Sequence, residues 1–161
     1  RYAPPATPAS SVAHWIRQAY LPVDRPQTGF IARTAALDRL WFDAMRNDVL
    51  DALRSRQQEV WAYDFDWDRL PPPFDAIFGA AHTFDLPFVF GNFGPSLYAH
   101  ILFTAQNRPG RLALSAQMMQ SLGAFARAGS PAHPGLGTPW APWPSRMVFD
   151  ADDASARVSA K

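Results

Sequence analysis

The sequence EVWAYDFDW, residues 59–67, carries the clearest structural signal in the chain. Aromatic residues occupy alternate positions in it, and the positions between them are small, apolar or acidic. This period of two predicts a β-strand with one aromatic face. The aromatic positions are Trp61, Tyr63, Phe65 and Trp67. Because no basic residue interleaves with them, we expect this face to pack in a core rather than to stack nucleic-acid bases.

An amphipathic helix is predicted on each side of this strand. Thr34 is a suitable N-cap for a helix from Ala35 to about Ser55, whose apolar residues form one stripe. A second helix is predicted from Leu112 to Ala128, with Gly129 ending it. Its expected buried face includes Ser115, Met118, Met119, Leu122, Phe125 and Ala126.

Weaker signals complete the outline. They predict a helix at Ser11–Tyr20, and strands at Met147–Phe149 and Ala156–Ser159 around an Asp152–Asp153 turn. The segment Phe74–Gly94 has no clean period, which predicts a loop. Helices that alternate with a strong strand favour an α/β layer architecture. A single strong strand cannot build a sheet, so we expect further strands from elsewhere.

Composition excludes several classes of function. The chain has 161 residues, a net charge of +1, no cysteine and 48% hydrophobic residues. A charge near zero removes the electrostatic reason for nucleic-acid binding, and the missing cysteine excludes disulfides and thiolate metal sites. No apolar stretch reaches the roughly 18 residues of a membrane span. Fourteen arginines against one lysine, with abundant Ala and Pro, are typical of a GC-rich bacterial gene.

The first residue is Arg1 rather than Met, which predicts a processed, cleaved or trimmed product. No signal-peptide core follows it. Cytoplasmic and secreted locations both stay open.

His82 is the main candidate for chemistry. It lies in GAAHTFDLPFVFG, residues 79–91, where the small residues before it allow the backbone to turn sharply. Histidine titrates near neutral pH and can pass a proton between a nucleophile and a leaving group. Loops that follow strands of α/β proteins often carry such residues. The alternative is a partly buried loop histidine that is hydrogen-bonded to the backbone.

The remaining candidates are weaker. His14 is expected at a helix surface or partly buried, His100 in a structural role, and His133 exposed in a Pro-rich loop. No two histidines have the i, i+4 spacing of a helical metal pair, so no metal site is expected. The alternating acids Asp64, Asp66 and Asp68 resemble the start of a calcium loop, but the required Gly and Glu are missing. None of the ten serines lies in a G-x-S-x-G nucleophile elbow.

Several segments together resemble the type-B carboxylesterases, the group that includes para-nitrobenzyl esterases and cholinesterases. Residues 79–91 resemble the catalytic-histidine segment of that family, and residues 60–67 are similar to its core strand. FARAGSP, residues 125–131, resembles a family turn, although Ala128 and Ser130 replace the usual Thr and Asp. Further landmarks follow in the family's order at residues 134–136, 140, 143–144 and 147–150.

The resemblance implies an α/β-hydrolase fold, a mostly parallel central sheet flanked by helices. Residues 1–161 would be the C-terminal part of one catalytic domain, completed by an upstream segment or a second chain. Residues 1–30 would be an irregular or helical lead-in, residues 31–150 the family-like region, and residues 151–161 a terminal strand or tail.

The resemblance also implies ester hydrolysis by a Ser-His-Asp/Glu triad without a cofactor. His82 would be the general acid–base, and the nucleophile and the acid would lie on an N-terminal segment or partner chain. Asp85 replaces the commoner Glu and matches a structural position; Phe84 is a candidate for the substrate pocket, and Phe88 and Phe90 are expected in the core. The alternatives are a non-catalytic esterase-like interaction protein and a standalone helical/β binding module.

Overall fold

The computed structural model describes residues 39–96 and 99–161. The chain divides into two compact units, residues 1–51 and 52–161. A helical segment crosses this division, with a π-helical part η3 (Phe42–Asn47) that continues into α3 (Asp48–Arg54). The end of the helix expected near Ser55 is confirmed, whereas its start and the helix expected at Ser11–Tyr20 lie outside the described residues. The described apolar stripe is exposed at Trp41, Met45, Val49 and Leu53.

Three strands of the second unit form a small mixed sheet. β1 (Tyr63–Phe65), β2 (Met147–Ala151) and β3 (Ala156–Ala160) lie in the order β1-β2-β3. β1 is parallel to β2, with Tyr63 opposite Met147, and β2 is antiparallel to β3. Both predicted terminal strands are confirmed. The expected mostly parallel sheet is mixed in this part, because β2 and β3 form a hairpin and only β1 to β2 needs a crossover.

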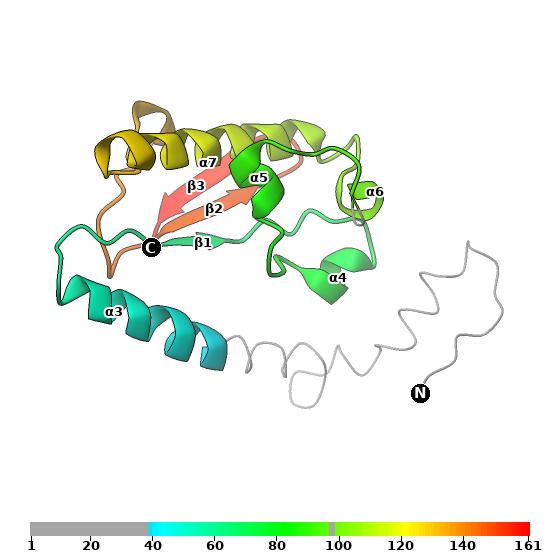
Figure 1. Ribbon diagram of the computed structural model, residues 1–161. Coiled ribbons are helices and arrows are strands. Elements are labelled where there is room, and N and C mark those ends of the chain that lie inside the picture. Colours follow the sequence, from blue (N-terminus) through cyan, green and yellow to red (C-terminus); the bar gives the residue numbers. More distant parts are fainter. Residues whose placement is uncertain (1–38, 97–98) are drawn as a thin grey trace. The chain divides into compact units, whose positions relative to one another are not determined.

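One face of the sheet forms the floor of the hydrophobic core. Met147, Phe149 and Ala151 alternate along β2 and are at most 1% exposed. Val158, opposite Phe149 on β3, packs against the same core. Helix α7 (Arg108–Ala128) lies over this face (Figure 1). Val148 is buried as well, and Asp150 alone in β2 is half-buried, as expected for the central strand of the three.

The strand predicted at residues 59–67 is present as β1. It pairs with β2 over only three residues, Tyr63–Phe65. Its expected aromatic core face is only partly correct. Trp67 is fully buried, but Tyr63 is 40% exposed, and Trp61 and Phe65 are half-buried. Val60 and Ala62, which alternate with the aromatic residues, are buried instead.

Helix α7 begins four residues before its predicted start and ends as predicted at Gly129, whose φ is +74°. Pro109 in its first turn fits the start, because proline lacks the amide hydrogen that this position leaves unbonded anyway. Its buried face differs from the prediction: Met118 is buried, whereas Met119, Leu122 and Phe125 are exposed. The residues buried along α7 are Gly110, Arg111, Leu114, Ser115, Met118 and Ser121.

The predicted loop Phe74–Gly94 contains two short helices, α4 (Phe74–Phe78) and α5 (Leu86–Phe90). A third, α6 (Ala99–Leu102), was not anticipated. α5 packs against α7, where the Ser115 hydroxyl donates a hydrogen bond to the Phe88 carbonyl at 2.8 Å. Phe88 is in the core as expected, but Phe90 is 68% exposed, so its predicted core position is wrong.

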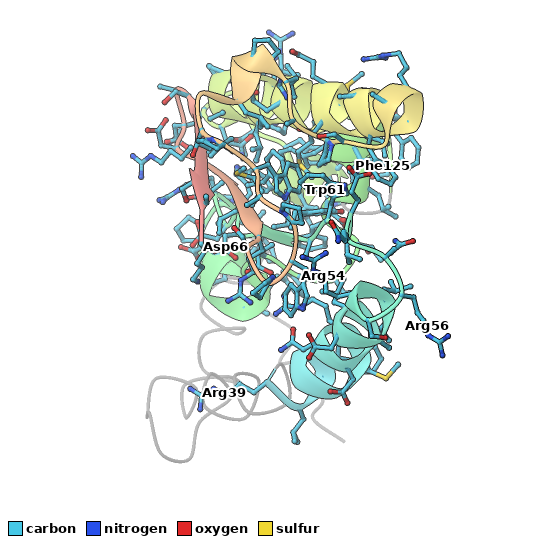
Figure 2. All side chains as sticks on the ribbon, turned by 90° about the vertical axis from the view of Figure 1, so that its left-hand side faces the viewer. Arg39, Arg54, Arg56, Trp61, Asp66 and Phe125 are labelled. Carbon is cyan, nitrogen blue, oxygen red and sulfur yellow. The ribbon has the colours of Figure 1, made fainter. Side chains whose placement is uncertain are left out.

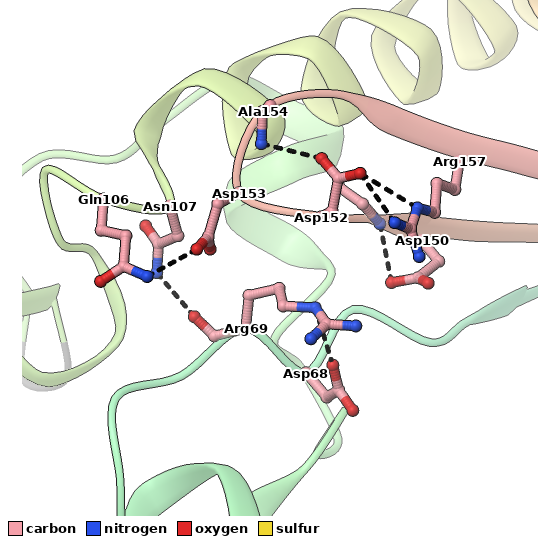
Figure 3. Close-up of polar contacts among 10 residues, drawn as sticks. Asp68, Arg69, Gln106, Asn107, Asp150, Asp152, Asp153, Ala154 and Arg157 are labelled. Atoms are coloured by element: carbon pink, nitrogen blue, oxygen red, sulfur yellow. Dashed lines mark hydrogen bonds and ion pairs between the residues drawn. The ribbon is translucent and has the colours of Figure 1, made fainter.

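A network of polar contacts joins the β2–β3 turn to the start of α7 (Figure 3). Asp152 Oδ1 accepts hydrogen bonds from the backbone amides of Ala154 and Ser155, and Arg157 pairs with its other oxygen at 2.8 Å. The Gly110 amide donates to the Asp153 carbonyl at 3.0 Å. These contacts fix the hairpin against the helix that covers the sheet.

Within residues 39–96 and 99–161, no helix has the length and hydropathy needed to cross a membrane.

Candidate functional site

The histidine loop, residues 79–85, connects α4 to α5. Gly79 ends α4 with φ +52° and ψ −142°, a conformation that side-chain-bearing residues rarely adopt. The Phe84 amide donates to the Ala81 carbonyl at 3.1 Å, which closes a turn around His82. Thr83 has φ +72°, which is unusual for a β-branched residue. The glycine and the small alanines thus let the chain turn back within a few residues, as the sequence predicts.

His82 is exposed at the outside of this turn. Its ring has no hydrogen bond or ion pair with any residue that the structure describes. The predicted alternative, a loop histidine bonded to the backbone, therefore finds no support in the described part.

Asp85 lies three residues after His82 but bonds to a different partner. Its Oδ2 accepts a hydrogen bond from the Tyr63 hydroxyl at 2.7 Å. Burial, and then the hydrogen bond to this carboxylate, raise the pKa of Tyr63 well above its ordinary value. This contact agrees with the structural role expected for Asp85. It was not foreseeable from sequence spacing, and the one available signal was that a tyrosine among aromatic residues carries a hydroxyl that needs a partner.

The other histidines have different surroundings. His133 is half-buried rather than exposed as predicted, because its Nε2 lies 3.1 Å from the Ser121 hydroxyl and 3.3 Å from the Gln117 carbonyl. His100, for which a structural role is expected, lies on α6 and is exposed. His14 lies outside the described residues.

The alternating acids do not converge on a metal site. Asp64 pairs with Arg146 at 2.7 Å, and Asp68 pairs with Arg69 at 3.4 Å. Asp66 is exposed. Among the residues described, no three histidine or acidic side chains are grouped closely enough to hold a metal ion.

A cavity of about 220 Å³ opens between the aromatic face of β1 and α7. Trp61 and Phe125, both labelled in Figure 2, are among the residues that line it. The Trp61 indole donates to the Gly129 carbonyl at 2.9 Å, which ties the strand to the end of the helix. Phe84 does not line this cavity. Its half-buried ring packs against the core, 6.2 Å from the ring of Phe78.

One family model matches most of the chain, and solved structures share its fold. A model described as "Carboxylesterase family" matches residues 8–156. The crystal structure of the carboxylesterase EST55 of Geobacillus stearothermophilus at pH 6.2 is similar over 98% of this chain, with a TM-score of 0.64 and 22% identity. The same enzyme at pH 6.8 gives a TM-score of 0.59 over 96%. No curated protein matches the chain.

A third structure extends the comparison. It is an esterase from anaerobic Clostridium hathewayi that can hydrolyze aliphatic aromatic polyesters, with a TM-score of 0.54, 16% identity and 96% of this chain covered. At these identities the likeness shows the fold alone. The chain spans only 30%, 32% and 31% of the three solved esterase chains.

Proposed function

Because the chain belongs to the carboxylesterase family, we propose that it contributes His82 as the general acid–base for the hydrolysis of carboxylic esters. One observation supports this role above the others. The His82 imidazole is exposed on a sharp loop and has no partner within the described residues. Among the chain's histidines described here, His133 is already held by Ser121 and Gln117. His100 is exposed too, but it lies on α6 and outside the segment that resembles the family's catalytic-histidine segment.

The reaction would proceed in two proton-balanced steps. As a serine hydroxyl attacks the ester carbonyl, a ring nitrogen of His82 takes the hydroxyl proton. The imidazolium then donates this proton to the oxygen of the departing alcohol, which leaves an acyl-enzyme. A water molecule repeats the sequence: His82 takes a proton from it and returns it to the serine as the carboxylic acid leaves.

The serine, the acid that orients His82 and the donors for the oxyanion are proposed to lie on the part of the esterase fold that this sequence does not contain. None of its ten serines has the G-x-S-x-G context of a nucleophile elbow. Asp85 does not serve as the acid in this scheme, because its carboxylate accepts the Tyr63 hydroxyl. Phe84, two residues after His82, stays our candidate for a side chain that lines the substrate pocket.

The test uses the complete esterase that contains this chain, assayed on short p-nitrophenyl esters. His82→Ala should lower kcat at least about 10³-fold, because loss of the base disables both proton transfers. His100→Ala is the matched control, since His100 is also exposed but lies on α6. Undiminished turnover by His82→Ala would reject the role. Absence of turnover by the unsubstituted esterase would favour a non-catalytic interaction protein instead.

A further inference from the structure

The hydrogen bond between Tyr63 and Asp85 joins two segments 22 residues apart, the sheet and the histidine loop. Tyr63 sits at a fixed point of the sheet. Its backbone is in register with Met147 of β2, and its ring meets the ring of Phe149 edge-on at 5.8 Å. The hydroxyl of Tyr63 is thus held in place by two buried residues of the central strand.

The Asp85 carboxylate is available to accept a hydrogen bond from this hydroxyl because it does not cap α5. It precedes the helix, yet its carboxylate makes no capping hydrogen bond to the helix amides. Its contact with Tyr63 therefore has a different effect. It joins β1 to the end of the loop that carries His82, three residues earlier in the chain.

This attachment adds a polar contact to the packing of the Phe84 ring against the core. Its backbone hydrogen bonds, Phe84 to Ala81 and Leu86 to Thr83, are local turns that shape the loop without fixing it to the sheet. Thr83, which directly follows His82, has φ +72°. A β-branched residue persists in this conformation only where its surroundings hold the chain in place.

The contact has a stable donor. Burial first, and then the hydrogen bond to Asp85, raise the pKa of Tyr63 well above its ordinary value. The phenol therefore keeps its proton, and the hydrogen bond its donor, throughout the pH range in which esterases are assayed.

We propose that Tyr63 and Asp85 are positioning residues, which fix the histidine loop to β1 and thereby set the place of the His82 imidazole. The inference rests on the proposed function of His82. Neither residue touches the substrate in this scheme. Their effect is on the fraction of time that the imidazole spends where it can reach the nucleophile.

Three variants of the complete esterase test the proposal: Tyr63→Phe, Asp85→Asn and the double substitution. Tyr63→Phe removes the hydroxyl and keeps the ring that meets Phe149. We expect each single variant to lower kcat by about 10-fold to 100-fold with KM within about twofold, because small misplacements of a catalytic group carry losses of this size. The double variant should lose no more than the worse single one, since all three break the same contact.

A control and a second measurement separate positioning from general loss of structure. Asp152→Asn is the matched control, because Asp152 is also a loop carboxylate that accepts hydrogen bonds, but in the β2–β3 turn. It should leave kcat unchanged. Amide hydrogen exchange should speed up at residues 80–85 in Tyr63→Phe and stay unchanged in β2.

The outcomes distinguish this inference from the proposed function. If His82→Ala is inactive while Tyr63→Phe keeps kcat and the exchange rates of residues 80–85, the positioning role is wrong and the role of His82 stands. If His82→Ala stays active, the proposed function itself fails. A loss of activity in Tyr63→Phe that merely follows a smaller folded fraction, with kcat per folded molecule unchanged, would also overturn the positioning role.

Discussion

The rings of His82 and His133 illustrate two uses of a histidine in one chain. His133 contacts a hydroxyl and a carbonyl at 3.1 and 3.3 Å, which restrains its ring between α7 and the following loop. His82 is exposed and has no such partner in the described part of the chain. In the proposed scheme the unpartnered ring leaves both nitrogens of His82 available, one for the nucleophile and one for the acid that orients it.

Asp152 gives a prediction at the level of a single residue. Hydrogen bonds from the Ser155 and Ala154 amides, followed by Arg157, lower the pKa of its carboxyl to about 2. An aspartate whose folded pKa lies below its unfolded value of about 3.9 stabilises the fold above that value. This contribution is lost as the pH falls through about 2. Asp152→Asn should therefore be less stable to urea than the unsubstituted chain at pH 7, and the gap should close between about pH 4 and pH 2.

Urea denaturation of both chains across this pH range measures the gap. A gap that stays constant down to pH 2, or a carboxyl of Asp152 that titrates near its ordinary value by NMR, would contradict the turn geometry of Figure 3.

Single positions in the core were only partly predictable from the sequence. Phe88 and Met118 are buried as expected, but their neighbours Phe90 and Met119 are exposed. Every residue of α5, LPFVF, is apolar, so no pattern indicates which side faces the core. The Tyr63–Asp85 contact was missed for a related reason, since it depends on the path of the chain between two distant segments.

At the level of elements, the start of α7 and the β2–β3 turn approach each other very closely. A β-carbon placed on Gly110 would lie 1.8 Å from the carbonyl oxygen of Asp152, which is a backbone atom and cannot rotate away. Gly123, in the same helix, would meet only the flexible end of Arg127 at 3.0 Å. The first glycine is therefore required by packing and the second is not.

These two glycines form a matched pair of substitutions. Gly110→Ala should destabilise the fold by about 1–3 kcal/mol, because the hairpin must move away from α7. Gly123→Ala should be neutral or stabilise the fold by up to about 1 kcal/mol, because alanine favours the helix interior. Thermal or urea unfolding measures both. Equal changes in the free energy of unfolding for the two substitutions would contradict the close packing of Gly110 against the β2–β3 turn.

Long periodic elements were more predictable than short ones. α7 was anticipated within four residues because its 21 residues show a helical period, and the two five-residue strands were anticipated because they flank the Asp152–Asp153 turn. α4, α5 and α6 have at most five residues each, which is too short for a helical period to be visible. β1 pairs over three residues because pairing depends on neighbouring strands, which the alternation of residues 59–67 cannot reveal.

At the level of the whole molecule, the chain accounts for 30% of the length of the carboxylesterase EST55, with which it shares its fold over 98% of its own length. The family was predictable because its motifs occur in order over residues 30–150, and the family model matches residues 8–156. A nucleophile, its acid and a substrate were not predictable, since none of the ten serines has a G-x-S-x-G context and no other segment indicates them.

The central claim, that His82 is the general acid–base, is tested most directly by the structure of the complete esterase. We expect a ring nitrogen of His82 to lie about 2.6–3.2 Å from the oxygen of a serine in a G-x-S-x-G elbow. The Tyr63–Asp85 hydrogen bond should be intact in the same structure. A different histidine beside that serine, or a His82 ring turned away and bonded elsewhere, would contradict the claim.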